Sequence, residues 1–254
     1  MFNKISVVCI IKNALKNGYC FWESLQSVLP FANELIISEG YSEDNTLVYM
    51  EKFVNKYKKK LPITLFRDKW DEESYHGEVI ANISMNAINK AKGDWIYYLQ
   101  ADEVIHEDSI NHIKHIATLP QFNSVSFPFY HFIRSWEPSK EGYTEAIRMI
   151  RRGKNITLMG DAWNFQGEIA PICPAGHDPK PIYHFAWSFS QQNDLKDIEH
   201  AKIYKNIPEY QEKMKMALQN TNKNKKPYPR TNFNDFPKLT RRFIGKAKYG
   251  PPKL

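Results

Sequence analysis

The chain contains little cysteine, with 3 cysteines in 254 residues. Cys9, Cys20 and Cys173 are scattered, odd in number, and never form a Cys-x-x-Cys pair. Disulfide frameworks and zinc knuckles both depend on cysteines at characteristic spacings, so neither is expected here. Because few disulfides are typical of reducing compartments, we expect a cytoplasmic protein.

Long apolar runs are also missing, since no stretch approaches the roughly 20 residues that cross a bilayer as a helix. The apolar segment 5–11 is short, Lys12 and Asn13 interrupt it, and no small-residue cleavage site follows. These features favour a first core strand over the core of a signal peptide. No Gly-rich, basic loop follows this strand, which argues against a nucleotidyltransferase with a phosphate-binding loop.

Aromatic residues make up 14% of the chain and hydrophobic residues 42%, which is enough to build a folded core. The formal net charge of +7 favours anionic partners, namely phosphates, nucleic acid or an acidic membrane surface. No RNA- or DNA-binding motif accompanies this charge. Nucleic acid is therefore the least favoured partner of the three.

Strand and helix patterns alternate through the first half of the chain. Such alternation predicts an α/β fold with a mainly parallel sheet and helices on both faces. Ser42 and Asp44 are expected to cap the second helix, and Gly93 is expected to end the third. The predicted strands are 5–11, 34–38, 63–66 and 95–99, and the predicted helices have apolar stripes within 21–29, 47–57, 80–91 and 110–116.

After about residue 120 the pattern changes to strands of mixed polarity, which predict antiparallel pairing. Beyond residue 220 the chain becomes rich in Lys, Arg, Pro and Asn. The predicted strands are 124–133, 146–151 and 182–186, and helix is predicted from 194 to about 219.

The most informative segment is 95–105, in which an apolar run stops at Asp102 and Glu103. In open α/β sheets, ligands bind in the crevice beyond the C-terminal ends of the strands. A carboxylate at that place can hold Mg²⁺ or Mn²⁺, which take oxygen ligands and bridge to phosphates. The alternative is that both acids only solvate the strand end or precede the next helix.

Three segments are expected to meet in this crevice, namely 10–13, 37–46 and 99–103. Here the sequence resembles the family 2 glycosyltransferases of the GT-A fold. In that family the second strand usually ends in Asp-x-Gly-Ser-x-Asp-x-Thr and the fourth in a DXD-type motif such as Asp-Ala-Asp-Glu. This chain has Ser-Glu-Gly-Tyr-Ser-Glu-Asp-Asn-Thr from Ser38 and Gln-Ala-Asp-Glu from Gln100. The resemblance covers roughly residues 5–118, and a weaker similarity to one subgroup of the family is present in 129–132 and 183–187.

The resemblance implies a GT-A fold with a nucleotide-sugar-binding half over 1–120, an acceptor-binding half of the same domain over 121–220, and a basic tail over 221–254. It implies a glycosyltransferase that moves a sugar from a nucleotide-diphosphate sugar, expected to be a UDP-sugar. The acceptor is expected to be a hydroxyl group of a glycan, a lipid-linked molecule or a protein. Inversion at the sugar carbon and assistance by Mn²⁺ or Mg²⁺ are also expected.

The same resemblance implies a set of donor contacts. Glu39 follows Ser38, which stands where the family has an Asp that binds the base or ribose, and a carboxylate there can accept from imide N–H or hydroxyl groups. The alternative for Glu39 is an ordinary loop acid. Asn86 matches a family position that often contacts the donor, or it is an ordinary polar position on a helix. The other expected donor contacts are Ile11, Lys12, Asn13, Gln100, Ala101 and Asp102.

The expected metal site is incomplete, because Gln100 replaces the first acid of the DXD-type motif and an amide is a poor ligand for these ions. Asp102 is the expected main metal carboxylate, with Glu103 in support. Many GT-A enzymes add a late histidine as a ligand, and His184 has that place here. The alternative for His184 is a histidine that is hydrogen-bonded at a strand edge.

An inverting transferase needs a base that deprotonates the acceptor hydroxyl. Asp161 and Glu168 are the candidates in the second half, and Asp161 is preferred because Trp163, a ring that can stack on a sugar, is close to it in the sequence. The rival hypothesis is a catalytically silent GT-A-like protein that binds a glycan or nucleotide, because Ser38 and Gln100 replace family acids.

The tail from 223 to 253 mixes Lys and Arg with aromatic residues. Such a segment can make a peripheral contact with an anionic membrane surface. The alternative is that it packs over its own domain.

Overall fold

The computed structural model describes residues 3–71, 78–139, 142–174, 180–189, 191–193, 196–197, 233–246 and 248–252. Its strands are β1 (Ile5–Ile11), β2 (Glu34–Glu39), β3 (Ile63–Arg67), β4 (Trp95–Leu99), β5 (Glu103–Val104), β6 (Ser124–Ile133), β7 (Glu145–Arg151), β8 (Ile156–Met159), β9 (Asn164–Gly167), β10 (Ile172–Pro174) and β11 (Ile182–Trp187). Its helices are α1 (Phe21–Val28), α2 (Thr46–Tyr57), α3 (Glu78–Ile88) and α4 (Ile110–Ile116), with short 3-10 turns η2 (Glu107–Ser109), η3 (Phe233–Asp235) and η4 (Lys238–Thr240).

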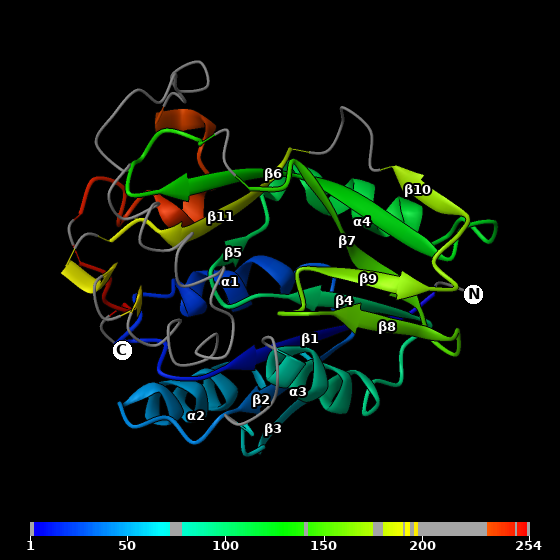
Figure 1. Cartoon of the computed structure of the whole chain (residues 1–254), viewed down its shortest axis with the longest axis horizontal. Coiled ribbons are helices and arrows are strands. Elements are labelled where there is room, and N and C mark those ends of the chain that lie inside the picture. The colour runs from blue at the N-terminus through cyan, green and yellow to red at the C-terminus, as the bar shows by residue number, and fades with distance from the viewer. Residues whose placement is uncertain are drawn as a thin grey trace.

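One nine-stranded sheet organises the molecule (Figure 1). Its order is β3-β2-β1-β4-β7-β6-β11-β5, with β10 paired to β6, while β8 and β9 form a separate hairpin. β1, β2, β3 and β4 are all parallel to one another. This is the mainly parallel α/β arrangement that the alternating first half predicts.

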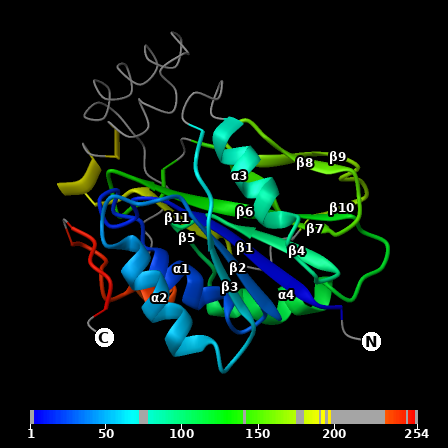
Figure 2. The same ribbon diagram turned by 90° about the horizontal axis from the view of Figure 1, so that it is seen from below.

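Helices cover both faces of the sheet (Figure 2). β1 is buried along its whole length, and successive residues of a strand point to opposite faces. Val7 and Cys9 therefore join the core beneath α1, α2 and α4, whereas Val8 and Ile10 join the core formed with α3 and the β8–β9 hairpin. A strand with two buried faces explains why the run 5–11 is continuously apolar.

β7 connects the two halves, because it pairs antiparallel to β4 and to β6. The predicted antiparallel pairing is confirmed for these strands. β11 differs, since it is parallel to β6 and antiparallel to β5. The sequence did not predict β5, β8, β9 or β10, because runs of two to four residues are too short to show a period.

Two turn residues can be compared with their expected roles. α3 ends well before Gly93, and a Cβ on Gly93 would lie 2.7 Å from the backbone nitrogen of Ser6. The expected helix cap at Gly93 is therefore wrong, and glycine is needed there because the chain passes close to β1. Asp44 does serve the start of α2, since its Oδ1 accepts a hydrogen bond from the backbone N–H of Thr46 at 2.8 Å.

The described part of the basic tail packs against its own domain. Phe236, Phe243 and Tyr249 are buried. Glu23 of α1 is also buried, and it pairs with Arg242 and accepts a hydrogen bond from the Tyr249 hydroxyl at 2.9 Å. Burial raises the pKa of Glu23, and the charge of Arg242 opposes that shift. These residues of the tail therefore pack over their own domain, which is one of the two alternatives expected from the sequence.

Phe233 is the exception among the described aromatic residues of the tail, because 51% of its surface is exposed. The helix predicted over 194–219 lies outside the described residues except at 196–197. In the part of the chain that the structure describes, no helix combines the length and the apolar character needed to cross a bilayer.

Candidate active site

A cavity opens where the order of the strands reverses. β1 has β2 on one side and β4 on the other, so the chain leaves β1 in one direction and later returns to its other side. Ligands of open α/β sheets bind at such a point, beyond the C-terminal strand ends. The cavity here has a volume of about 280 Å³. From β1, β4 and the residues that follow them, it is lined by Ile11, Lys12, Gln100, Ala101 and Asp102.

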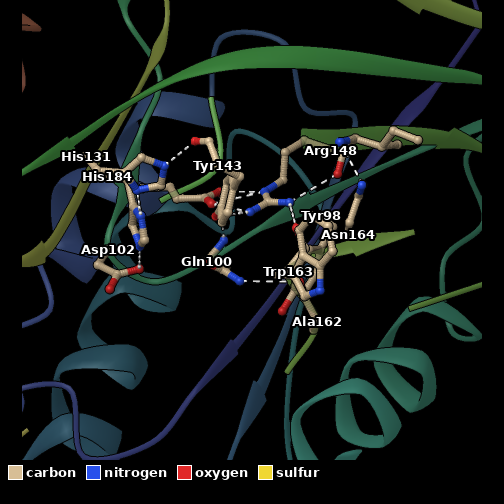
Figure 3. Close-up of polar contacts among 12 residues, drawn as sticks. Tyr98, Gln100, Asp102, His131, Tyr143, Arg148, Ala162, Trp163, Asn164 and His184 are labelled. Carbon is tan, nitrogen blue, oxygen red and sulfur yellow. Dashed lines mark hydrogen bonds and ion pairs between the residues drawn. The ribbon is translucent and has the colours of Figure 1, made fainter. Parts of the chain in front are cut away.

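The second half of the chain supplies the opposite walls. The rings of Tyr143 and Trp163 both line the cavity, with centroids 5.8 Å apart and planes inclined by 37° (Figure 3). Asp161 belongs to the same turn as Trp163, between β8 and β9. Flat rings beside a carboxylate suit a polyhydroxylated ligand, which offers both an apolar face and hydroxyl groups. The other wall residues of this half include His131, His184, Trp187 and Lys196.

Asp102 lines the cavity with only 7% of its surface exposed. Its Oδ2 lies 3.0 Å from Nζ of Lys196, and its Oδ1 lies 3.4 Å from Nε2 of His184. Burial alone would raise the pKa of Asp102, but Lys196 and His184 hold it well below its usual range. Asp102 is therefore ionised, and each of its oxygens faces a nitrogen of the chain.

The tautomers of two histidines follow from their partners (Figure 3). His131 Nε2 lies 2.6 Å from the carbonyl oxygen of Tyr143, and a carbonyl only accepts, so this nitrogen carries a hydrogen. Burial and the neighbouring His184 lower the pKa of His131 to about 3, so its Nδ1 is an acceptor. His184 Nδ1, at 2.8 Å, must then donate. This bond orients His184 so that Nε2 faces Asp102.

Glu103 has a different place from the one expected. Its two oxygens accept from Nε of Arg148 at 3.0 and 3.1 Å and from Nη2 at 2.7 Å, and both side chains are fully buried. Arg148 also donates to the Tyr143 hydroxyl at 2.9 Å and to the Trp163 carbonyl at 2.8 Å. Glu103 is not among the residues that line the cavity. Instead of supporting a metal, it holds the arginine that fixes two wall residues.

The residues present do not fit a divalent cation at Asp102. Gln100 donates its Nε2 to the carbonyl of Ala162 at 3.4 Å, and Glu103 is taken by an arginine. Lys196 already provides a positive charge beside Asp102. Among the described residues, no group of three or more His, Cys, Asp or Glu side chains could hold a metal ion. The metal ligands expected from the resemblance therefore do not assemble into a site.

Glu39 ends β2 beside Ile11, but it is not among the residues that line the cavity. Its carboxylate is buried and accepts from the backbone N–H of Tyr41 at 3.1 Å, the backbone N–H of Ser42 at 2.6 Å and Nε of Arg67 at 2.9 Å. Burial would raise the pKa of Glu39, but the hydrogen bonds from Ser42 and Arg67 hold it below its usual range. Glu39 thus closes the turn after β2, and its contact with a base or ribose stays a prediction.

Asn13 and Asn86 are engaged away from the cavity. Oδ1 of Asn13 accepts from the backbone N–H of Glu43, and its own N–H donates to Oγ of Ser42, both at 2.8 Å. These bonds tie the end of β1 to the loop before α2. Asn86 is exposed on α3 and donates to Asp68 at 3.3 Å.

The two candidate bases lie at opposite ends of the β8–β9 hairpin. Asp161 is in its turn and lines the cavity. Glu168 follows β9, is exposed, and accepts from the backbone N–H of Asn155 at 3.2 Å. The four residues of β9 between the two ends span roughly 13 Å, so only Asp161 can reach a ligand in the cavity.

Sequence reasoning missed several residues of the site. Trp70 follows β3, so the rule that ligands gather beyond parallel strand ends could have found it. Arg148 interrupts the apolar run of β7, which is a signal for a buried ion pair. Tyr19, Tyr143 and Lys196 carry no local signal of a role in the cavity.

No protein-family model matches the chain, and no curated protein matches it. Among solved structures, it is similar to the mannosyltransferase PcManGT from Pyrobaculum calidifontis in complex with GDP-Man and Mn²⁺, at 14% identity and a TM-score of 0.43, over 59% of this chain and 45% of that one. It is also similar to S. aureus TarS 1-349 in complex with UDP, at 16% identity and a TM-score of 0.48, over 78% and 65%. The complex of that protein with UDP-GlcNAc gives 15% identity, a TM-score of 0.48, and coverage of 78% and 66%. Likeness at this level does not extend to site or substrate.

Proposed function

We propose that the protein is a glycosyltransferase that moves a sugar from a nucleoside-diphosphate sugar to an acceptor hydroxyl group. The observation that carries the proposal is the cavity at the reversal of strand order. It unites the ends of β1 and β4, which bear the segments resembling family 2 glycosyltransferases, with the aromatic wall and Asp161. A UDP-sugar as donor and a glycan, lipid-linked or protein acceptor belong to the same proposal.

Groups that suit a diphosphate line this cavity. Lys12 and Lys196 are both among its lining residues, and cations in a partly desolvated site bind phosphate oxygens strongly. The indole Nε1 of Trp70 is buried and has no hydrogen-bond partner among the described residues. Because buried donors are nearly always paired, a bound donor molecule that accepts from Trp70 would complete the site.

The chemistry needs one bond to form and one to break at the anomeric carbon. Asp161 takes the proton of the acceptor hydroxyl, and the acceptor oxygen forms the new bond to that carbon. The bond from the carbon to the diphosphate oxygen breaks, and the nucleoside diphosphate leaves with the electron pair. Attack opposite to the leaving group inverts the configuration. Positive groups near Asp102 stabilise the charge that develops on the leaving group.

The Glu103–Arg148 pair has a defined part in this scheme. Arg148 holds the hydroxyl of Tyr143 and the backbone of Trp163. Both residues belong to the wall beside Asp161. A fixed wall limits the orientations of the sugar, which matters because small displacements of reacting groups cost large factors in rate.

The test is release of nucleoside diphosphate by the purified full chain from a panel of UDP- and GDP-sugars with sugar acceptors. Asp161→Asn is expected to lower release by about 10²–10⁴-fold while leaving the nucleotide-induced rise in melting temperature intact. Glu168→Gln is the matched control and should keep full activity. Nucleotide binding by the wild type without release from any donor would refute transfer and favour a GT-A-like binding protein.

A further inference from the structure

Lys196 has an unusual environment for a lysine. Only 2% of its surface is exposed, and lysine is almost never so buried unless it is paired. Its Nζ lies 3.0 Å from Oδ2 of Asp102 and donates to the carbonyl of Ala186. The same ammonium lies over the rings of Tyr19 and Trp187, at 4.3 and 4.4 Å from their centroids. A carboxylate, a carbonyl and two aromatic faces thus enclose one positive charge.

Lys196 also belongs to the wall of the cavity, as does Asp102. An ammonium has three N–H donors, and among the described residues Asp102 and Ala186 are the two acceptors for them. By this count the third N–H has no acceptor among the described residues, and an anionic oxygen of a bound ligand would be its best acceptor.

We propose that Lys196 is the built-in cation of this site: its ammonium stands where a divalent ion would bind Asp102, and it contacts the diphosphate of the donor directly. Donor binding and transfer then need no added metal. This inference rests on the proposed glycosyltransferase function and names the residue that replaces the expected Mn²⁺ or Mg²⁺.

The neighbouring residues support the replacement. A divalent ion on Asp102 would be placed next to the ammonium of Lys196, and like charges at contact distance repel strongly in a site of low dielectric. Gln100 stands in place of the first acid of the motif, and Glu103 is bound by Arg148. Asp102 and Glu103 are thus already neutralised by Lys196 and Arg148.

The arrangement also suits the chemistry. The rings of Tyr19 and Trp187 keep water away from the ammonium, which strengthens its attraction for a phosphate oxygen. The contact with Asp102 holds Nζ in place before the donor arrives, so little reorganisation is needed when charge develops on the leaving group. A purely structural lysine would hold Asp102 in the same way, but nucleotide affinity would not depend on its charge.

The wild-type test uses UDP and GDP as probes and Mn²⁺ alone as the metal. Melting temperature and calorimetric affinity are measured for the full chain in excess EDTA and in Mn²⁺. We expect a nucleotide to bind with the same affinity, within about twofold, in both buffers. The rate of donor turnover should likewise be the same in EDTA and in Mn²⁺. Mn²⁺ alone should leave the melting temperature unchanged. Binding and turnover that appear only with Mn²⁺ would overturn the role of Lys196 and leave the transferase function standing.

Three variants test the residue itself. Lys196→Met removes the charge but keeps the length, and should weaken nucleotide binding at least tenfold in EDTA, whereas Lys196→Arg should keep most of it. Lys196→Ala frees Asp102, so it should gain binding of Mn²⁺, seen by electron paramagnetic resonance, and Mn²⁺ should restore its nucleotide affinity. Lys58→Ala, on the end of α2, is the control and should behave as wild type.

The outcomes separate the two proposals. Unchanged nucleotide affinity in a folded Lys196→Met variant would show that the lysine is only structural and would overturn the inference. If the variants do not fold, the comparison of EDTA and Mn²⁺ on the wild type still decides it. Failure of both nucleotides and of every donor, with or without Mn²⁺, would overturn the proposed function and this inference with it.

Discussion

Replacement of Arg148 by methionine tests the buried ion pair behind the cavity. Methionine replaces the unbranched apolar stem of arginine and is flexible enough to fill an irregular space, so the change removes the charge and the donors while keeping the packing of the stem. The carboxylate of Glu103 then stays buried without its partner, since both side chains are fully buried. Removing one member of such a pair costs about 3–5 kcal/mol of unfolding free energy. For a chain of this size that corresponds to a fall in melting temperature of about 6–20 °C.

The assay is urea unfolding followed by tryptophan fluorescence, with calorimetry for the melting temperature. The double variant Glu103→Leu with Arg148→Met removes both charges and should be more stable than Arg148→Met alone by at least about 1 kcal/mol. Arg152→Met is the control, because Arg152 is exposed and its Nε makes one hydrogen bond to the Gly93 carbonyl, worth about 1 kcal/mol. An Arg148→Met protein within about 1 kcal/mol of wild type would refute the reasoning.

Three further predictions concern catalysis and acid stability. Asp161→Asn should lower turnover by about 10²–10⁴-fold at unchanged nucleotide affinity, and comparable loss in Glu168→Gln would contradict the choice of base. Because the pKa of His131 is lowered to about 3, the unfolded chain binds a proton first as pH falls. Stability is therefore present above about pH 6.5 and declines toward pH 3 by at most about 1.4 kcal/mol per pH unit. A His131→Gln variant should show a flatter slope between about pH 7 and 5, and equal slopes in urea unfolding would disprove this. The pKa of Glu39 is lowered from 4.5 by its hydrogen bonds from Ser42 and then by Arg67, so the stability from these contacts is present above that pH and is lost as pH falls through the folded pKa. Glu39→Gln should remove this acid-side loss, as measured by unfolding at about pH 6 and pH 3.5.

The elements of the first half could be predicted because each leaves a local pattern. β1 is buried on both faces, which produces a continuous apolar run. Met50, Phe53 and Tyr57 are the buried positions of α2 in its later turns, and this spacing is the period of a helix that covers a sheet. The hairpin of β8 and β9 was missed, although it carries Asp161 into the cavity, because two strands of four residues leave no comparable signal.

The candidate site could be predicted only in part. Parallel strands place their C-terminal ends at one edge, so reasoning from strand ends brought the segments after β1 and β4 together correctly. The same reasoning expected Glu39 and Glu103 to face a ligand. Arg148 holds Glu103 instead, whereas turn amides and Arg67 hold Glu39, whose contact with a base or ribose stays a prediction. The end of a strand predicts where the backbone of a residue lies but not which group its side chain contacts.

By itself, the sequence determined the layer of parallel strands and the position of Asp102 at the edge where their C-terminal ends lie. Only the tertiary structure decided which cation stands beside that carboxylate, since Lys196 is 94 residues away from Asp102 along the chain. Arg148 is likewise 45 residues from Glu103. The path of the chain between packed elements decides which charged residues come into contact in a buried site. That path depends on the whole core, whereas a sequence pattern reports only residues that are neighbours within one helix or strand.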